Sequence, residues 1–344
     1  MRVVIIKLNS LGDNVVFVPV VQSIRQRCPD WRITLLSTPK ESELYGGKLA
    51  PQDVIVCQKT RFNKAYRRPW ELARWVWRIR RLRPDACLIP FDQSNVAHLV
   101  AKLSGARSRV GGNLERIRVA GSLTETVPMP EDLRPVTWNW RMARALAHLL
   151  GAGDGWPTEP LPPDLAHLLP SGPRARGPRP RVVVHPGAGG PLNQWPRERF
   201  AEVASSLSRD FDVVWIEHGA ATSPPVGATP APVATIAELA GWLASAHLFL
   251  GNNSGPMHLA NALGIPGVAV TGPTTTGWDP YWNRRQWTVL RHPDLACAPC
   301  EKTTVALTGC ANLASPMACL KYWTAEKVEA ACRQRLGRDA GRAP

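Results

Sequence analysis

The sequence predicts an α/β protein built around parallel sheets. Three segments carry this prediction, because in each a short apolar strand runs into a polar turn containing glycine and then into a helix: residues 3–27, 181–208 and 248–263. Open α/β sheets bind ligands at the carboxyl ends of their strands. We therefore expect functional groups at the three turns.

The length of 344 residues favours two domains over one. In the first, residues 1–165, we expect strands at 3–7, 33–36, 53–57, 86–90 and 109–111. Residues 166–180 are rich in proline and glycine and are predicted to be a linker. In the second, residues 181–323, we expect strands at 181–185, 213–217, 248–251 and 267–271. Residues 324–344 should form a closing helix and a tail.

Composition limits the classes of partner. The net charge of +15 predicts anionic partners such as acidic headgroups, phosphorylated glycans or nucleic acid, although solvated basic faces are the simpler alternative. Nucleic acid is not expected, because no nucleic-acid-binding motif accompanies the charge. The chain has no apolar run long enough to span a membrane and no signal-peptide pattern at its start, so we expect a cytoplasmic protein. Its eight cysteines are then expected to be free thiols or ligands, not disulfides.

One basic segment allows two interpretations. Residues 70–82 place an apolar stripe of Leu72, Trp75, Val76, Ile79 and Leu82 on one helix face and arginines on the other. A helix of this kind can lie on a membrane surface. A crossover helix that covers the sheet is the favoured interpretation.

The segment at 248–260 predicts an anion-binding turn. Gly251 and Gly255 would permit positive φ and close backbone approach, Ser254 would be the N-cap, and Pro256 suits the first helical turn. The N–H groups and the dipole of a helix that begins there favour a phosphate. A tight strand-to-helix turn without a ligand is the alternative.

Six motifs occur in order along the chain: KLNSLGD at 7–13, HPGAG at 185–189, QWPRERF at 194–200, GNNSGPMHLA at 251–260, GPT at 272–274 and WDPY at 278–281. Together they resemble the glycosyltransferase family that contains the bacterial ADP-heptose:lipopolysaccharide heptosyltransferases. The resemblance implies the GT-B architecture, in which two Rossmann-like domains with parallel sheets face a central cleft. The first domain would bind the acceptor and the second the nucleotide sugar.

The resemblance also implies an activity. An inverting enzyme of this family would move a heptose or related sugar from a nucleoside diphosphate, ADP-heptose first, to a hydroxyl of lipopolysaccharide core or another glycan. No cofactor would be required for the chemistry. A protein or natural-product acceptor, or a non-catalytic nucleotide-sugar-binding homologue, is the alternative. Peripheral contact with the inner membrane is expected if the acceptor is a glycolipid.

Asp13 is the predicted catalytic residue. From position alone an aspartate after Gly12 at a helix start is a capping residue or a general base, and the resemblance implies the base. The other residues follow from the same resemblance. The implied acceptor contacts are Lys7, Ser10, Asp92 and Gln93. The implied donor contacts are His185, Gly187, Ala188, Gly189, Asn193, Trp195, Glu217, Asn253, Ser254, Gly255, Met257 and His258.

Two of these positions depart from the family pattern. The family commonly has a lysine at the position of Asn193 and an aspartate at that of Asn253. A cation near the donor phosphates and a carboxylate near the donor sugar are thereby replaced by amides, which changes hydrogen-bond direction. A changed donor, a changed acceptor and reduced activity all agree with this difference.

Four cysteines lie in one loop-rich stretch: Cys297, Cys300, Cys310 and Cys319. Their spacing allows a tetrahedral structural zinc or iron site, and the resemblance adds that some family members that glycosylate proteins carry iron there. Unligated buried thiols are the alternative. A nicotinamide oxidoreductase is not expected, because residues 7–15 contain one glycine and lack the dinucleotide fingerprint.

Overall fold

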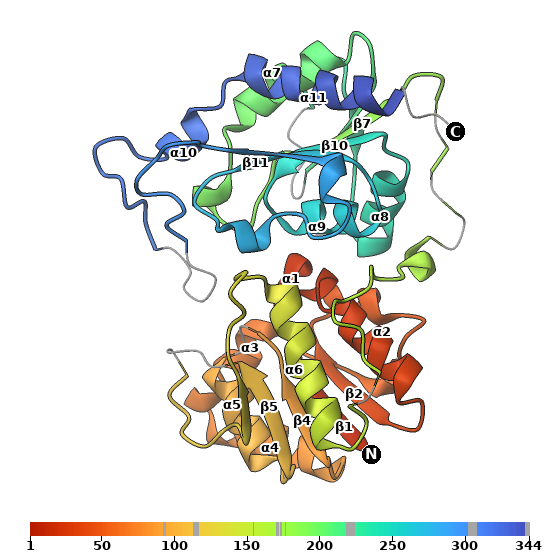
Figure 1. Cartoon of the computed structure of the whole chain (residues 1–344), viewed down its shortest axis with the longest axis vertical. Helices are drawn as coiled ribbons and strands as arrows, with labels where there is room; N and C mark the ends of the chain where they lie inside the picture. The colour runs from red at the N-terminus through yellow and green to blue at the C-terminus, as the bar shows by residue number, and fades with distance from the viewer. Residues whose placement is uncertain are drawn as a thin grey trace. The chain divides into compact units, whose positions relative to one another are not determined.

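The computed structural model describes the chain except residues 92–93, 113–116, 154, 170–171, 173, 176, 218–223, 302–307 and 341–344, and of 338–340 it describes only the backbone. The chain divides into two compact units, Met1–Asp164 and Leu165–Pro344, called unit 1 and unit 2. Figure 1 colours unit 1 from red to yellow-green and unit 2 from green to blue. Each unit is described by itself.

Unit 1 is built on a six-stranded parallel sheet of order β3-β2-β1-β4-β5-β6. The strands are β1 Arg2–Ile6, β2 Arg32–Ser37, β3 Val54–Val56, β4 Ala86–Ile89, β5 Ser108–Gly112 and β6 Glu125–Val127. The central strands are continuous apolar runs because helices cover both faces of such a sheet.

The helices of unit 1 are α1 Leu11–Val15, α2 Val18–Arg27, α3 Lys59–Asn63, α4 Pro69–Arg81, α5 Asn95–Leu103 and α6 Pro135–Leu149. Short 3-10 turns are η1 Glu41–Tyr45, η2 Pro51–Asp53 and η3 Ala65–Arg67. The helix expected in the later part of residues 3–27 is α2, which begins at Val18 with Pro19 in its first turn, and the short α1 forms within the turn before it. One core cluster joins strand residues such as Ile6 and Ile89 to Ile79 of α4 and Val100 of α5.

Unit 2 repeats this topology. Its sheet is also parallel and has the order β12-β11-β10-β7-β8-β9. The strands are β7 Arg181–His185, β8 Asp212–Ile216, β9 Thr229–Ala231, β10 Leu248–Asn252, β11 Gly267–Thr271 and β12 Trp287–Arg291. Two Rossmann-like parallel sheets confirm the predicted fold class, although β6, β9 and β12 were not predicted.

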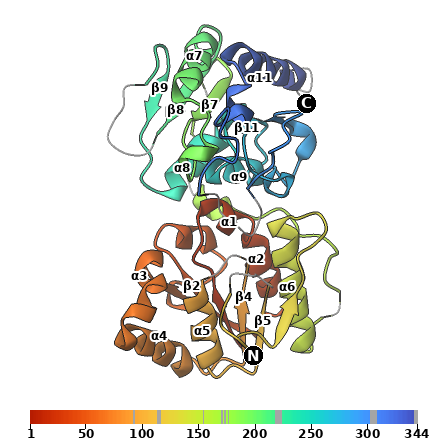
Figure 2. The same cartoon turned by 90° about the vertical axis from the view of Figure 1, so that its left-hand side faces the viewer.

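The helices of unit 2 are α7 Arg197–Leu207, α8 Ile236–Ala244, α9 Gly255–Ala262, α10 Ala318–Lys321 and α11 Ala325–Ala340. The 3-10 turns are η4 Ala166–Leu168, η5 Pro191–Asn193, η6 Thr276–Trp278 and η7 Arg284–Gln286. Helix α11 packs beside α7, and Figures 1 and 2 both show it along the edge of unit 2. Its buried Val328 and Cys332 join Phe200 of α7 and the central strands in one core.

The strand order places a topological switch point in each unit. In unit 1 it lies between β1 and β4, and in unit 2 between β7 and β10, because successive connections leave these strand pairs in opposite directions. Ligands of such sheets bind at the carboxyl ends of the strands at this point. The turns after β1, β7 and β10 are therefore the ones that the topology selects.

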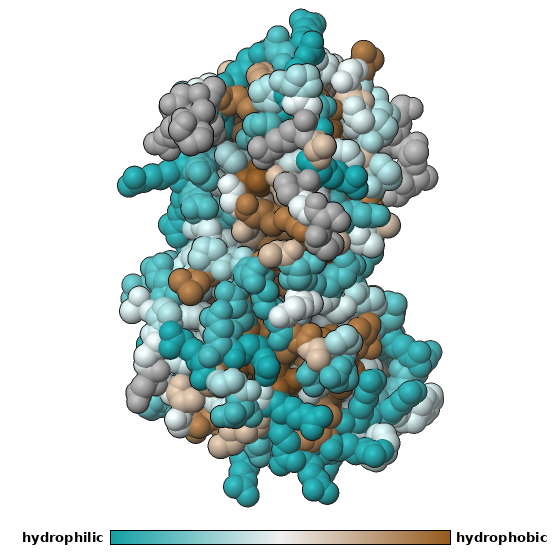
Figure 3. All heavy atoms as spheres, turned by 90° about the vertical axis from the view of Figure 1, so that its right-hand side faces the viewer, coloured by the Kyte–Doolittle hydropathy of each residue, from teal (hydrophilic) through white to brown (hydrophobic). Residues whose placement is uncertain are grey.

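The face drawn in Figure 3 is covered mostly by hydrophilic residues, with hydrophobic ones showing in recesses between them. This agrees with apolar side chains gathered in a core within each unit. In the described part of the chain, each helix is too short or too polar to cross a bilayer.

Candidate active site

The turn after β1 brings three predicted residues together. Lys7 follows the buried strand directly, Ser10 stands at the N-cap position of α1, and Asp13 lies in the first turn of that helix. Ser10 Oγ donates a hydrogen bond of 2.7 Å to Asp13 Oδ2. Asp13 Oδ1 accepts no hydrogen bond from the residues that the structure describes, so one carboxylate oxygen is left for a ligand hydroxyl.

Two buried residues that no sequence motif pointed to, Asn14 and Tyr45, hold this turn. Asn14 Nδ2 donates to the carbonyl oxygens of Asn9 and Ser10 at 2.9 and 3.0 Å. Asn14 Oδ1 accepts a hydrogen bond of 2.8 Å from the hydroxyl of Tyr45. Because both side chains are fully buried, they fix the backbone that carries Asp13. Burial, with the nearby carboxylates of Glu41 and Asp13, holds the pKa of Tyr45 above its usual value, so it stays a donor.

The neighbouring strand end is also anchored. The N–H of Phe91, just beyond β4, donates to Asn139 Oδ1 of α6 at 3.0 Å in the buried interior. The predicted acceptor contacts Asp92 and Gln93 come next in the chain and lie outside the described residues. Their roles stay predictions.

Lys7, a predicted acceptor contact, is fully buried. Its Nζ lies 3.5 Å from the carbonyl oxygen of Phe91 and 5.6 Å from the ring centre of Phe17. Burial lowers the pKa of Lys7 to about 8; the charge of Asp13 opposes this shift and that of Lys59 adds to it. The geometry places a positive charge near Asp13. The acceptor contact implied for Lys7 stays a prediction.

The lowered pKa of Lys7 predicts a pH-dependent stability. Between pH about 8 and about 10.5 the unfolded chain keeps the proton that folded Lys7 has lost, so the free energy of unfolding contributed by this residue rises with pH. Urea unfolding at pH about 7.5 and about 9.5 should show wild type gaining about 1 to 3 kcal/mol relative to Lys7→Met.

The comparison must be a difference between the two proteins, because burial raises the pKa of Cys57 to about 12 and of Cys87 to about 11, and raised thiol values lower stability over the same range. These thiols are common to both proteins and cancel. Identical pH slopes in wild type and Lys7→Met would show that Lys7 is not perturbed.

The turns of unit 2 are joined by Asn252, the last residue of β10. Its Oδ1 accepts from the N–H of Trp195 at 2.9 Å, and its Nδ2 donates to the carbonyl oxygens of Pro186 at 2.7 Å and Gly187 at 3.3 Å. Asn252 is fully buried. It therefore fixes the turn after β7. The space next to Gly189 in this turn is open, because a Cβ added there would meet no atom within 4 Å.

The start of α9 differs in detail from the prediction. Ser254 occupies the N-cap position with extended backbone, but its hydroxyl donates to the carbonyl oxygen of Asn252 at 3.2 Å and makes no side-chain cap. Pro256 is in the first turn, as predicted. Neither Gly251 nor Gly255 has positive φ. Gly251 is required by close approach, since a Cβ there would lie 2.9 Å from the carbonyl oxygen of His185.

The two departures from the family pattern belong to one polar network. Asn193 Nδ2 lies 3.4 Å from Glu301 Oε2, and the hydroxyl of Thr274 donates to the same oxygen at 3.1 Å. Arg291 donates to the carbonyl oxygen of Thr274 and, at 2.8 Å, to Asp279 Oδ1.

Asn253 Nδ2 completes the network, at 3.5 Å from the same Asp279 oxygen. The two amides are thus connected through Glu301, Thr274, Arg291 and Asp279. Sequence reasoning noted the GPT and WDPY motifs but not Arg291 or Glu301, which reach the network only through the fold.

Several predicted donor contacts have structural partners. Trp195 and Met257 are buried, and Trp195 packs edge-on against Phe200 with ring centres 4.7 Å apart. Their roles as donor contacts stay predictions. Glu217 accepts two hydrogen bonds from Arg197, at 2.9 and 3.0 Å, and one from Trp215 at 3.0 Å.

The predicted histidines lie at the two turns. His185 and His258 are both buried, at the end of β7 and in the first turns of α9. The ring of His258 lies 5.8 Å from that of Trp278. Ala188, between Gly187 and Gly189, accepts a hydrogen bond from Gln194 Nε2 at 3.2 Å through its carbonyl oxygen.

The four clustered cysteines line one small cavity, together with residues such as Leu192 and Met317. Thiolates are suitable ligands for zinc or iron. Among the described residues, however, no group of three or more His, Cys, Asp or Glu side chains is arranged to hold a metal ion. Burial raises the pKa of Cys300 and Cys319, which favours the thiol. The thiols as placed do not fit a bound metal, and metal binding stays a prediction.

Residues 99–310, more than half of the chain, match the model of glycosyltransferase family 9 (heptosyltransferase). The chain belongs to this family. A lipooligosaccharide heptosyltransferase 2 of Campylobacter jejuni is 32% identical over 139 residues, which cover 36% of this chain and 43% of the relative. The match thus spans less than half the length of that curated relative.

Solved structures of the family share the fold. The E. coli ADP-heptose lps heptosyltransferase II has a TM-score of 0.70 and 18% identity, over 99% of this chain and 100% of that one. The E. coli heptosyltransferase WaaC with ADP-2-deoxy-2-fluoro heptose has a TM-score of 0.68 and 17% identity, over 97% of this chain and 99% of that one. The predicted GT-B family fold is confirmed.

Proposed function

We propose that this protein is an inverting glycosyltransferase that moves a heptose or related sugar from a nucleoside diphosphate to a hydroxyl group. ADP-heptose is the first candidate donor, and lipopolysaccharide core or another glycan is the candidate acceptor. Family membership supports the reaction class. The observation that carries the proposal is Asp13, which stands at the switch point of unit 1 with Oδ1 unengaged by described residues.

In the proposed reaction, Asp13 removes the proton of the acceptor hydroxyl. The acceptor oxygen forms a bond to the anomeric carbon as the bond from that carbon to the phosphate oxygen breaks, and the nucleoside diphosphate leaves with the electron pair. Attack opposite the leaving group inverts the configuration. Ser10 holds Asp13 Oδ2, and buried Lys7 adds a positive charge nearby, so both position the base and set its electrostatic environment.

The donor diphosphate is proposed to lie between the turn at 187–190 and the start of α9. The first N–H groups of a helix have no partner within the helix and favour negative charge. Negative charge grows on the leaving phosphate during the reaction, so donors fixed in advance stabilise the transition state more than the ground state. The hydrogen bonds from Asn252 to residues on either side of the turn at 187–190 fix that turn, which supports its role in binding the diphosphate.

We extend the proposal to a cytoplasmic enzyme at the inner membrane surface, because a glycolipid acceptor would be embedded there. A non-catalytic nucleotide-sugar-binding protein is the second candidate, favoured by the neutral Asn193 and Asn253.

Two measurements distinguish the enzyme from the non-catalytic binding protein. They are calorimetric titration with a panel of nucleotide sugars and mass analysis of the products formed with glycan, protein and small-molecule acceptors. Release of nucleoside diphosphate with a sugar-bearing product supports the enzyme, whereas tight binding without product supports the second candidate.

The position of Asn193 makes a testable prediction about donor affinity. Asn193→Lys should tighten nucleoside diphosphate binding by about 0.5 to 2 kcal/mol, because it restores a partly solvated cation, and the gain should shrink at high salt. Glu301 Oε2 lies 3.4 Å from Asn193 Nδ2 and would compete for the new ammonium. The double variant Asn193→Lys/Glu301→Gln should therefore gain more than Asn193→Lys alone.

Titration of ADP, GDP and UDP at two ionic strengths measures both effects. Asn193→Met, which lengthens the side chain without adding charge, is the matched control and should show no salt-dependent gain. If Asn193→Lys and the double variant both bind like wild type, position 193 does not face the phosphates.

A further inference from the structure

The positive charge of the protein is concentrated in one short segment. Residues 59–83 contain ten lysines and arginines and a single glutamate, so this segment carries +9 of the net charge of +15. It comprises α3, η3 and α4 of unit 1. Charge of one sign gathered in this way attracts an extended anionic surface more strongly than the same charge spread over the protein.

Helix α4 also exposes large aromatic side chains. Its inner face, with buried Ile79, packs on the sheet as predicted. Trp70 and Trp77 are 70% and 58% exposed, and nearby Tyr66 is 58% exposed. Seven residues separate the tryptophans, so they share the outer face. Of the four exposed aromatic side chains in the described part of the chain, three lie here.

Arginines accompany these aromatic rings. The guanidinium of Arg81 lies 4.7 Å from the ring centre of Trp77, and that of Arg67 lies 5.5 Å from the ring of Tyr66. Tryptophan and tyrosine rings prefer the headgroup level of a bilayer, and arginine prefers lipid phosphates. A surface that faces only water gives the rings no headgroup layer and the arginines no lipid phosphates.

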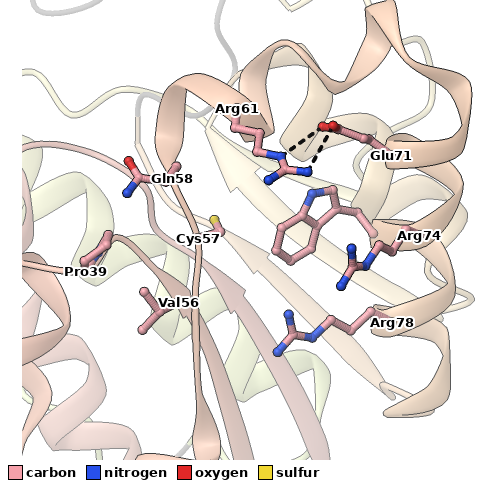
Figure 4. A pocket seen from close by; sticks show the side chains of 9 residues that line it. Pro39, Val56, Cys57, Gln58, Arg61, Glu71, Arg74 and Arg78 are labelled. Carbon is pink, nitrogen blue, oxygen red and sulfur yellow. Dashed lines mark hydrogen bonds and ion pairs between the residues drawn. The ribbon is translucent and has the colours of Figure 1, made fainter.

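A basic pocket adjoins the outer face of α4. It has a volume of about 300 Å³ and lies between α4 and the ends of β2 and β3. Figure 4 shows Arg74 and Arg78 extending from α4 toward the side where Val56 and Cys57 lie. Arg74 lines this pocket and is exposed, and its spacing of four residues from Trp70 and three from Trp77 puts it beside them on the helix.

The carboxylate in the pocket does not neutralise these two arginines. Glu71 Oε1 accepts from Arg61 at 3.2 Å and from Arg68 at 3.1 Å, so it is already shared by two cations. Arg78 lies over Trp75, 5.6 Å from its ring centre. Neither Arg74 nor Arg78 forms an ion pair with a described residue. The pocket therefore offers two guanidinium groups to an external anion.

We propose that α4 and this pocket dock unit 1 on an anionic phospholipid bilayer, an inference that builds on the membrane location in the proposed function. Trp70 and Trp77 lie at headgroup level, and Arg74 and Arg78 bind lipid phosphates. A bilayer is favoured over a soluble polyanion because a polyanion would use the charge but give no reason for two exposed tryptophans beside it. The helix thus covers the sheet with one face and contacts the membrane with the other.

Cosedimentation with vesicles tests the proposal and needs neither donor nor acceptor, so its result is independent of the proposed reaction. Wild type should bind vesicles of phosphatidylethanolamine and phosphatidylglycerol in equal amounts, should bind phosphatidylcholine vesicles weakly, and should lose binding as salt is raised. Trp70→Ala/Trp77→Ala and Arg74→Glu/Arg78→Glu should each lower affinity for the anionic vesicles by roughly tenfold or more.

Arg141→Glu/Arg144→Glu is the matched control, because it makes the same charge change at exposed positions of α6 in the same unit. It should bind almost like wild type. Equal loss in the α4 and α6 charge variants, no effect of the tryptophan variant, or binding of heparin without binding of vesicles would overturn the proposal. Circular dichroism of each variant confirms that a loss of binding is not a loss of fold.

Discussion

Asp13→Asn should lower the turnover number by on the order of 100-fold or more, because a general base typically contributes at least that much. The amide has the shape of the carboxylate and can still accept the hydrogen bond from Ser10, but it cannot take the acceptor proton. Affinity for the nucleoside diphosphate should stay near that of wild type, because the proposed donor site is in unit 2. Turnover is measured as nucleoside diphosphate release at saturating donor and acceptor, and affinity by calorimetry.

Two variants control for indirect effects. Asp30→Asn removes an exposed carboxylate of the same unit and should leave turnover unchanged. Ser10→Ala should cause a smaller loss than Asp13→Asn, because it removes the group that orients the base and not the base itself. Unaltered turnover in Asp13→Asn on a confirmed substrate would refute the assignment of Asp13.

Asn252→Ala should destabilise the protein by about 2 to 4 kcal/mol and weaken nucleoside diphosphate binding. It leaves the N–H of Trp195 and the carbonyl oxygens of Pro186 and Gly187 without their present partner in a buried place, and each such group costs about 1 to 3 kcal/mol. The turn at 187–190 also loses its tie to β10. Urea unfolding measures the first effect and calorimetric titration with ADP the second.

Asn253→Ala is the neighbouring control. Asn253 is half-buried, and the one hydrogen bond of its side chain to a described residue is the 3.5 Å contact with Asp279, so its loss should change stability by less than about 1 kcal/mol. Equal destabilisation by the two substitutions would mean that the buried contacts of Asn252 do not hold the turns together.

The inner strands of both sheets and the edge strand β3 could be predicted from sequence, whereas the other three edge strands, β6, β9 and β12, could not. β1, β7 and β10 are apolar runs bounded by turn residues, which is the pattern of strands buried on both faces. In β6 and β9 only the last residue is buried. Such strands form because the adjacent strand of the sheet provides backbone hydrogen bonds. Their own sequence therefore lacks the apolar pattern that predicts a strand.

The candidate site shows the same division. Local motifs identified the turns, including Asp13 and the start of α9, because the residues that form a turn are consecutive in the sequence. Tyr45 and Glu301 reach the site from distant parts of the chain, and only the fold places them there. Trp195, predicted as a donor contact, is buried and donates a hydrogen bond of 2.9 Å to the carbonyl oxygen of Trp323, a partner that only the fold reveals.

The most direct measurement of the proposed reaction is proton NMR of the wild-type enzyme with ADP-heptose and a lipooligosaccharide core acceptor. We predict that ADP is released only when acceptor is present, and that the new glycosidic bond has the anomeric configuration opposite to that of the donor. Asp13→Asn should give no detectable product over the same time. A product that keeps the donor configuration, or a confirmed transfer that proceeds equally in Asp13→Asn, would contradict single-step displacement with Asp13 as the base.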